Sequence, residues 1–396
     1  MLDNSKDHSL RNQSNQLKNN ILPYPLFAFL VLFAVGCSNS DIKVIEFEKG
    51  PFTLMDSIVI PDFFERDIQE SNKFFNPKSE DDFFIISRPL QGVLLKISAD
   101  FKTIDTIRVT HNIDLFGVIS ITDSKVFQIK QNGMQVYDFS TLADSFIPLQ
   151  NANRIGNTGY MNNGITPYKE FYLLREFPNY PPYKTWDSYH KYLDMFGYHV
   201  IDGEGNNKGL MRYFDTILYD KSILSKNAQI GGVNVFQDSF LLYDFSELNQ
   251  VYLVDGNNRL IKKIPLASQF EEKQVPLTFE EYQNTEHRLQ KGLEMFIYQH
   301  LSINKQIKII YRTSFFPIIK KINETGLKSF KFDAPWSIVS RKYNQSLNFS
   351  NQKEIHFEAK KFDPRVVYYI GDRLILKKYD FTTNNLTIYS YKSDLY

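Results

Sequence analysis

The chain has very little cysteine and histidine. Cys37 is its only cysteine, and seven histidines are spread over 396 residues. One thiol excludes intrachain disulfides and zinc sites that need several cysteines. No HExxH motif, no histidine pair at metal-ligand spacing, no GxSxG elbow, no Walker loop and no GxGxxG fingerprint occurs. The sequence therefore predicts no metal, no cofactor and no recognisable catalytic motif.

An excess of charge of either sign is also lacking. The chain has 46 basic and 45 acidic residues, and its formal net charge is +1 at pH 7. No basic stripe or block of like charge stands out. Proteins that bind nucleic acid usually present such a patch to the phosphates. We therefore expect no nucleic-acid partner.

Long hydrophobic runs are absent apart from one near the N-terminus, Ile21 to Val35, which is 15 residues long and contains Pro23 and Pro25. A membrane-spanning helix needs about 20 apolar residues, so the run suits the hydrophobic region of a signal peptide better. The polar region before it carries Lys6, Arg11 and Lys18. Residues 1–36 are therefore predicted to be a signal peptide.

The hydrophobic run ends in "FAVGCS", which includes Cys37. The stretch resembles the signal of bacterial lipoproteins, although Ala34 stands where such signals usually have leucine. The resemblance implies cleavage before Cys37, a diacylglycerol on its thiol and an acyl chain on the new amino terminus, which together anchor stably to a membrane. Residues 37–50 would then be a lipidated tether. The alternative is a buried cysteine beside a signal peptide cut elsewhere.

Most of the chain after residue 50 reads as short strands, because apolar or alternating runs recur between turn residues. In residues 125–149 we predict a hairpin with its turn at Asn132-Gly133, a pair that tolerates positive φ. Related stretches recur, among them "YDFS" at 137–140 and 243–246 and "YDFT" at 379–382. Six such units can be marked, near 84–110, 118–149, 166–214, 232–266, 298–332 and 353–391.

This pattern predicts an all-β fold, a six-bladed β-propeller over residues 51–396. The strand-rich segments 42–47 and 52–60 would complete the last blade and close the ring. The structural alternative is a pair of β-sandwich domains. Two segments break the pattern: a helical insertion near 278–296 and an aromatic loop near 175–198 that contains a proline cluster.

The stretch "HVIDGEGNNKGLMR", residues 199–212, resembles a calcium loop, because Asp202, Glu204 and Asn206 are spaced two apart. Counting from Asp202, however, the sixth position is Asn207 and the twelfth is Tyr213, where such a loop needs glycine and glutamate. "VDGNNR" at 254–259 shares the glycine and asparagine residues but not the ligand spacing. We interpret both stretches as turns.

The aromatic loop is the candidate binding site. Residues 171–198 contain ten aromatics, which suit stacking on a sugar, a base or a peptide. The alternative is that an inserted loop fills a small core of its own with tyrosines. The candidate ligand-binding residues are Tyr180, Tyr183, Trp186, Tyr189 and Tyr192.

From lipobox to the final "YDFTTNNLTIYSY", the chain resembles lipoproteins of Bacteroidota whose function is uncharacterised and which are similar to six-bladed, TolB-like propellers. The resemblance implies a propeller in the cell envelope and carries no active site with it. Ser38, in place of an aspartate after the cysteine, favours the outer over the inner membrane.

Two functions fit these features. The first is a lipid-anchored binding or scaffold module for an envelope protein, peptide or glycan. The second is an envelope enzyme that cleaves glycan, with acidic residues that converge only in three dimensions. Buried carboxylates lining a central funnel would favour the enzyme; the sequence itself leans against one.

Overall fold

The computed structural model describes these residues: 42–63, 83–109, 113, 115, 118–121, 124–130, 132–149, 165–175, 197–212, 231–245, 248–257, 259–271, 284, 286, 296–316, 334–359, 361–363, 367–380 and 382–396. The segment from Ile42 to Tyr396 is one compact unit. In the described residues of this segment, the regular structure consists of strands and two short 3₁₀ turns, η1 (Phe47–Lys49) and η2 (Pro89–Gln91). No helix in this described part is long and apolar enough to cross a membrane.

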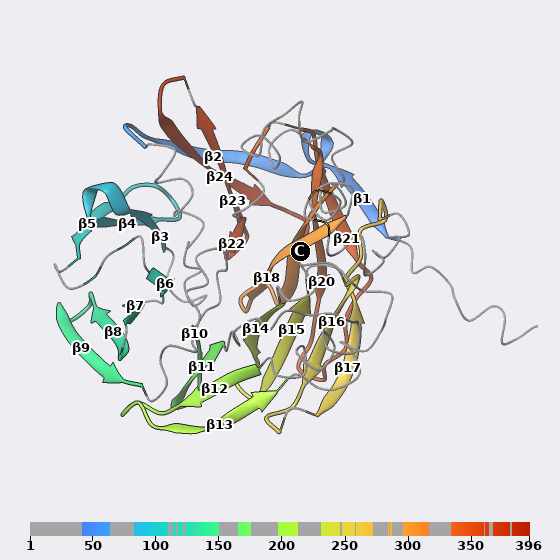
Figure 1. Ribbon diagram of the computed structural model, residues 1–396. Helices are drawn as coiled ribbons and strands as arrows, with labels where there is room; N and C mark the ends of the chain where they lie inside the picture. Colours follow the sequence, from blue (N-terminus) through green and yellow to red (C-terminus); the bar gives the residue numbers. More distant parts are fainter. Residues whose placement is uncertain are drawn as a thin grey trace, which may run out of the picture. The chain divides into compact units, whose positions relative to one another are not determined.

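Within the described residues, strands β3 to β24 form six sheets in which consecutive strands pair antiparallel, and these sheets follow one another along the chain (Figure 1). We number these sheets as blades one to six. The strands of blades one to three are β3 (Phe83–Arg88), β4 (Val93–Ser98), β5 (Ile104–Arg108); β6 (Val118–Ile121), β7 (Lys125–Lys130), β8 (Gly133–Asp138), β9 (Ala143–Pro148); and β10 (Ile165–Tyr168), β11 (Phe171–Arg175), β12 (Gly197–Ile201), β13 (Asn207–Arg212).

Blades four to six contain β14 (Gly231–Phe236), β15 (Phe240–Phe245), β16 (Gln250–Val254), β17 (Leu260–Pro265); β18 (Ile297–Asn304), β19 (Ile309–Phe315), β20 (Trp336–Lys342), β21 (Lys353–Phe357); and β22 (Tyr368–Ile370), β23 (Arg373–Asp380), β24 (Asn385–Ser393). A series of such antiparallel sheets is the architecture of a six-bladed β-propeller. The predicted fold class is confirmed.

The N-terminal segment closes the last blade, as predicted for 52–60. Strand β2 (Phe52–Ile60) pairs antiparallel with β24 and becomes the fourth strand of blade six. The expectation for 42–47 was wrong. Strand β1 (Lys43–Glu46) pairs in parallel with β21, so blade five has five strands.

Ring stacking explains why the chain crosses from blade five to blade six at this point. Phe47 follows β1, and its ring centroid lies 4.8 Å from that of Phe357 on β21 and 4.9 Å from that of Phe52 on β2. Phe357 in turn stacks on Trp336 at 3.9 Å. Within residues 37–50, Lys43–Glu46 therefore pair with blade five, and Phe47 packs between blades five and six.

The predicted units correspond closely to blades one to four, but the boundary between the last two was misplaced. The third strand of blade five begins only at Trp336, and 353–357 form β21 of the same blade instead of opening blade six. Pairing across the sheet decides this, since Ile338 on β20 lies opposite Ile355 on β21. The predicted helical insertion near 278–296 lies almost wholly outside the described residues.

The hairpin predicted at Asn132-Gly133 exists, but the glycine has a different role. Gly133 pairs with Lys130 and is the first residue of β8, and neither it nor Asn132 has a positive φ. A Cβ on Gly133 would lie 2.4 Å from the carbonyl oxygen of Ile147 on β9. Glycine is needed here because the neighbouring strand approaches closely.

Blades three to six are joined through their first strands β10, β14, β18 and β22, each of which lies beside the next. Thr166 on β10 donates its hydroxyl to the carbonyl of Val233 on β14 at 3.2 Å. In the same way, Asn234 on β14 donates to Leu301 of β18 at 3.1 Å, and Asn304 on β18 donates to Tyr369 of β22 at 3.0 Å. Each bond satisfies a carbonyl of the next blade, so these polar side chains fix how successive blades sit against one another.

Candidate functional site

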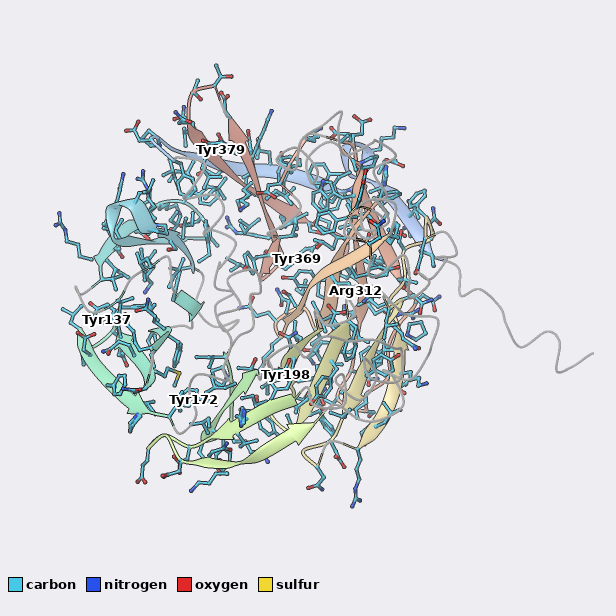
Figure 2. All side chains as sticks on the ribbon, viewed as in Figure 1. Tyr137, Tyr172, Tyr198, Arg312, Tyr369 and Tyr379 are labelled. Carbon is cyan, nitrogen blue, oxygen red and sulfur yellow. The ribbon has the colours of Figure 1, made fainter. Side chains whose placement is uncertain are left out.

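The five predicted ligand-binding aromatics and Cys37 lie outside the described residues. The aromatic residues that border the loop are described, and they belong to the core. Tyr172 on β11 packs edge-on against Phe127 of blade two, with centroids 5.5 Å apart. Tyr198 on β12 is fully buried and lies 6.2 Å from the ring of Tyr243 in blade four (both tyrosines of blade three are labelled in Figure 2).

The stretch that resembled a calcium loop is the turn between β12 and β13. One carboxylate oxygen of Asp202 accepts the backbone N–H groups of Glu204 (3.0 Å) and Asn206 (2.8 Å). The other accepts the Asn206 side-chain amide at 2.9 Å and pairs with Lys208 at 2.8 Å. These donors hold the pKa of Asp202 well below its usual value.

The second stretch folds in the same way between β16 and β17. Asp255 accepts the backbone N–H groups of Asn257 (2.9 Å) and Arg259 (2.8 Å). In both turns the aspartate binds donors of its own loop, which confirms the turn interpretation. No group of three or more metal-ligating side chains is found within the described ranges.

The repeated "YDF" stretches differ from one another in a way that the sequence did not reveal. Asp138 ends β8 and Asp380 ends β23, and each caps an exposed turn by accepting N–H groups of the next residues, Ser140 at 3.0 Å and Thr382 at 2.8 Å. Asp244 stands at the corresponding end of β15 but is buried. The copy at 243–246 therefore has a separate role.

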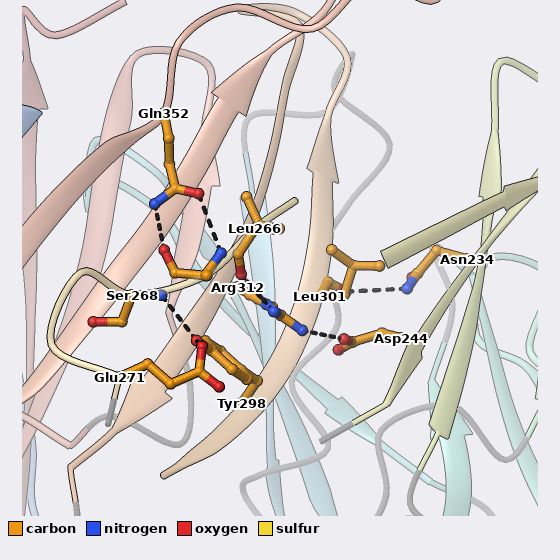
Figure 3. Close-up of polar contacts among 10 residues, drawn as sticks. Asn234, Asp244, Leu266, Ser268, Glu271, Tyr298, Leu301, Arg312 and Gln352 are labelled. Carbon is orange, nitrogen blue, oxygen red and sulfur yellow. Dashed lines mark hydrogen bonds and ion pairs between the residues drawn. The ribbon is translucent and has the colours of Figure 1, made fainter. Parts of the chain in front are cut away.

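Asp244 forms a buried ion pair with Arg312, which lies on β19 of blade five and is labelled in Figure 2. The guanidinium Nη1 donates to Asp244 Oδ1 at 2.8 Å, and Nε donates to the carbonyl of Leu266 at 2.9 Å (Figure 3). Arg312 has no exposed side-chain surface. Burial raises the pKa of Asp244, and the guanidinium opposes that effect.

The Arg312 guanidinium also lies over an aromatic ring, with its Cζ 3.6 Å from the ring centre of Tyr298 on β18. The Tyr298 hydroxyl donates to Glu271 at 2.7 Å and accepts the backbone N–H of Ser268 at 2.8 Å (Figure 3). Burial raises the pKa of the Tyr298 phenol well above its usual value and also raises that of the Glu271 carboxyl.

A third carboxylate, Glu354 on β21, is fully buried. It accepts the hydroxyls of Ser268 and Ser337 at 2.5 Å each and the backbone N–H of Gln269 at 2.8 Å. Gln352 is the residue directly before β21. Its side-chain oxygen accepts the N–H of Ala267, and its side-chain nitrogen donates to the carbonyl oxygen of Ala267 (Figure 3).

These groups make up one cluster, which we call the four-five cluster: Asp244, Ser268, Glu271, Tyr298, Arg312, Ser337, Gln352 and Glu354. Residues 266–271 are the connection that leaves β17 of blade four. The cluster binds this connection to blade five through hydrogen bonds. Its buried charged atoms are bound to partners and enclosed, so the cluster is suited to holding two blades in register. Its carboxylates lie on the second and fourth strands and on the connection, away from the first strands where a funnel would be lined.

Sequence reasoning missed this cluster because its members come from six separate segments. The one available signal was the "YDF" copy at 243–245. "YDFSELNQ" at 243–250 lacks the second hydroxyl residue that follows Asp138 in "YDFST" and Asp380 in "YDFTT".

No protein-family model and no curated protein sequence matches this chain. Among solved structures, it is similar to a member of the DUF4221 family from Bacteroides vulgatus, with a TM-score of 0.59, 13% identity, and coverage of 86% of this chain and 97% of that chain. Virginiamycin B lyase from Staphylococcus aureus also matches, with a TM-score of 0.38, 8% identity, and coverage of 86% and 99%. The Pan2 WD40 domain from Neurospora crassa has a TM-score of 0.41, 9% identity, and coverage of 86% and 95%. At these identities the first likeness supports the propeller fold alone, and the other two carry no argument.

Proposed function

We propose that this protein is a lipid-anchored β-propeller of the bacterial cell envelope that acts as a binding or scaffold module for an envelope protein, peptide or glycan. The observation that carries the proposal is how the N-terminal segment enters the fold. Strand β1 begins at Lys43, six positions after Cys37, and pairs with blade five, while β2 completes blade six. An anchor on Cys37 would therefore hold the compact propeller unit close to the membrane.

The four-five cluster supports a scaffold more than a catalyst. Arg312 and Glu354 have no exposed surface, and each is bound to groups of the protein itself. A catalytic carboxylate must reach the substrate, whereas these side chains join blades. In a scaffold, such internal bonding keeps the outward-facing loops in fixed positions.

The binding residues we propose are the aromatics between β11 and β12: Tyr180, Tyr183, Trp186, Tyr189 and Tyr192. The strands on either side are paired, Arg175 lying opposite Tyr198, so both ends of the loop are fixed by blade three. Tyrosine and tryptophan rings with a polar edge suit stacking on a sugar or a peptide. The outer membrane is the proposed location.

The anchor is tested by mass spectrometry of the mature N-terminus and by fractionation. We expect the first residue to be a lipid-modified Cys37 and the protein to remain with the membranes until detergent is added. A Cys37→Ala variant should lose that modification. An unmodified Cys37 within an intact N-terminal peptide would reject the anchor.

Binding is tested by crosslinking the protein in its native envelope and identifying what is captured. A Tyr183→Ala/Trp186→Ala variant should lose its specific partner. Phe146→Ala serves as the matched control, because it removes an aromatic ring that is 48% exposed on β9 of blade two. Equal capture by both variants would remove the aromatic loop from the proposal.

A further inference from the structure

Five lysines from separate segments meet at the end of blade five where the N-terminal segment enters. Lys43 is the first residue of β1, Lys353 the first of β21 and Lys342 the last of β20. Lys308 lies in the turn between β18 and β19, and Lys262 lies on β17 of blade four. We call this set the tether-side basic surface.

Strand pairing brings the lysines of blade five together. Lys43 lies directly opposite Lys353 in the β1–β21 pair. Lys342 lies opposite Ile309, the residue after Lys308, and the carbonyl of Lys308 accepts the N–H of Tyr343 at 2.8 Å. The pKa of Lys353 is lowered by burial and by the positive charges of Lys43 and Lys342, which agrees with their closeness.

Blade four continues this surface. Lys262 donates to the carbonyl of Leu347 at 3.3 Å, within the connection that joins β20 to β21. Arg341 bridges the same two blades by donating to Pro265 at 2.6 Å and Ser350 at 2.7 Å. The lysine of blade four therefore lies beside the connection that links Lys342 and Lys353.

None of the five lysines forms an ion pair within the part of the chain that the structure describes. Other lysines there do so, including Lys208 with Asp202 at 2.8 Å and Lys305 with Asp238 at 3.0 Å. Lys305 is left out of the surface for that reason. Like charges that have no ion-pair partner repel one another, so an anionic partner would stabilise the arrangement.

Two apolar side chains accompany these charges. Leu260 and Ile261, next to Lys262 on β17, are 38% and 48% exposed. Lysines beside exposed aliphatic side chains suit the boundary of a bilayer, where phosphates attract the ammonium groups and the apolar groups enter between headgroups.

The length of the tether identifies the partner. An extended chain spans at most about 3.6 Å per residue, so Lys43 cannot lie more than about 22 Å from Cys37. We propose that the tether-side basic surface docks on the anionic phosphate headgroups of the membrane in which Cys37 is anchored. This inference rests on the proposed lipid anchor, and it adds an orientation: this end of blades four and five faces the bilayer.

The surface is tested apart from the anchor with the full-length Cys37→Ala chain and phosphatidylcholine vesicles prepared with or without phosphatidylglycerol. Adding Lys262→Gln, Lys308→Gln and Lys342→Gln should weaken binding to the anionic vesicles by about tenfold or more, because each lysine near an anionic surface contributes measurably. The same chain should bind less tightly as salt rises.

The matched control replaces Lys96, Lys130 and Lys378 with glutamine, which removes equal charge from blades one, two and six. Residues 1–36 are the same in both variants, so any binding by that segment cancels. We expect the control to change binding by about twofold or less. Equal losses in the two variants would overturn the docking surface.

Orientation is tested on the lipidated protein, in which an introduced cysteine is the one free thiol. A fluorophore on Ser346→Cys, near Lys342, should be quenched by a headgroup-bound quencher in anionic vesicles. A fluorophore on Leu142→Cys, 71% exposed in blade two, should not be. Equal quenching at both positions with lipidated Cys37 would reject the docking while leaving the anchor intact, and an unlipidated Cys37 would reject the anchor alone.

Discussion

The two faces of blade five hold their neighbours by different means. Along β19 to β21, alternate residues face blade four and include Arg312, Ser337 and Glu354. The residues between them face blade six and include Trp336 and Phe357, whose stacked rings lie 3.9 Å apart. The same three strands thus add a buried polar cluster to the apolar contacts of Ile310 and Val339 on one side, and they present a mainly aromatic and aliphatic surface on the other.

The difference shows what each kind of contact contributes. Rings on the blade-six face gain stability mainly from buried apolar area, a contribution that is not directional. Charges on the blade-four face are stable only while each keeps its partner, because an unpaired buried charge is strongly unfavourable. The polar cluster therefore determines how blade four is placed against blade five, and the aromatic face contributes mainly to the stability of the contact with blade six.

The largest expected effect comes from breaking the polar face at its centre. Arg312→Met should lower the free energy of unfolding by about 3–5 kcal/mol, because Asp244 stays buried without its partner. The measurement is urea denaturation followed by circular dichroism. A double variant, Arg312→Met with Asp244→Leu, should recover most of the loss. If it recovers nothing, the pair does not act as a unit.

The aromatic face should respond by volume instead. Phe357→Ala should cost about 3 kcal/mol in the same assay, because it removes a ring packed between Trp336 and Phe47. Phe357→Leu should cost markedly less, since it keeps most of the volume. Equal losses from the two substitutions would show that shape, rather than buried area, governs this face.

A smaller effect is expected at the edge of the four-five cluster. Tyr298→Phe keeps the ring beneath Arg312 but removes the hydroxyl between Glu271 and the Ser268 N–H. We expect a loss of about 1–3 kcal/mol from the groups left unsatisfied. Tyr311→Phe, on the other face, removes a hydroxyl that accepts the N–H of Tyr369 at 3.0 Å and provides the comparison.

The smallest effect is the change in the free energy of unfolding with pH. The sign of this change distinguishes buried from exposed aspartates. Burial raises the pKa of Asp244 above 3.8, so its unfavourable contribution at neutral pH should disappear as pH falls through that raised value. For Asp100, hydrogen bonds from Ser98 and Lys102 lower the pKa to about 2. Its stabilising contribution is present above 3.8 and is lost as pH falls toward 2.

The comparison is made by measuring urea midpoints of Asp244→Asn and Asp100→Asn against wild type across that acidic range. Relative to its variant, wild type should gain stability with acid in the first case and lose it in the second. The same sign in both cases would contradict the assignment of burial as the cause for Asp244.

Local signals predicted much of the fold because strands and turns depend on neighbouring residues. The alternation around Ile107 and the Asp-Gly turn at Asp202 were sufficient to locate β5 and the β12–β13 turn. Prediction was wrong where pairing partners lie far apart in sequence. Nothing near Lys43 indicates that β1 pairs with β21, about 310 residues later, instead of with the last blade.

The candidate sites also differ in whether their residues are neighbours in the sequence or are brought together only by the fold. The lipidation and aromatic-loop predictions rest on contiguous residues and remain predictions. The four-five cluster and the tether-side basic surface could not be predicted, because their residues are single polar positions in otherwise ordinary strands. The sequence shows no basic block, yet five lysines meet once the strands pair.

The sequence by itself therefore determined the all-β class, the series of six units and the turn chemistry, since these follow from periodicity and from residues in contact along the chain. Only the tertiary structure decided that Asp244 of the middle "YDF" copy is buried against Arg312, and that β1 and β2 join different blades. Those outcomes depend on which distant residues compete for the same buried position, and a local pattern carries no information about such competition.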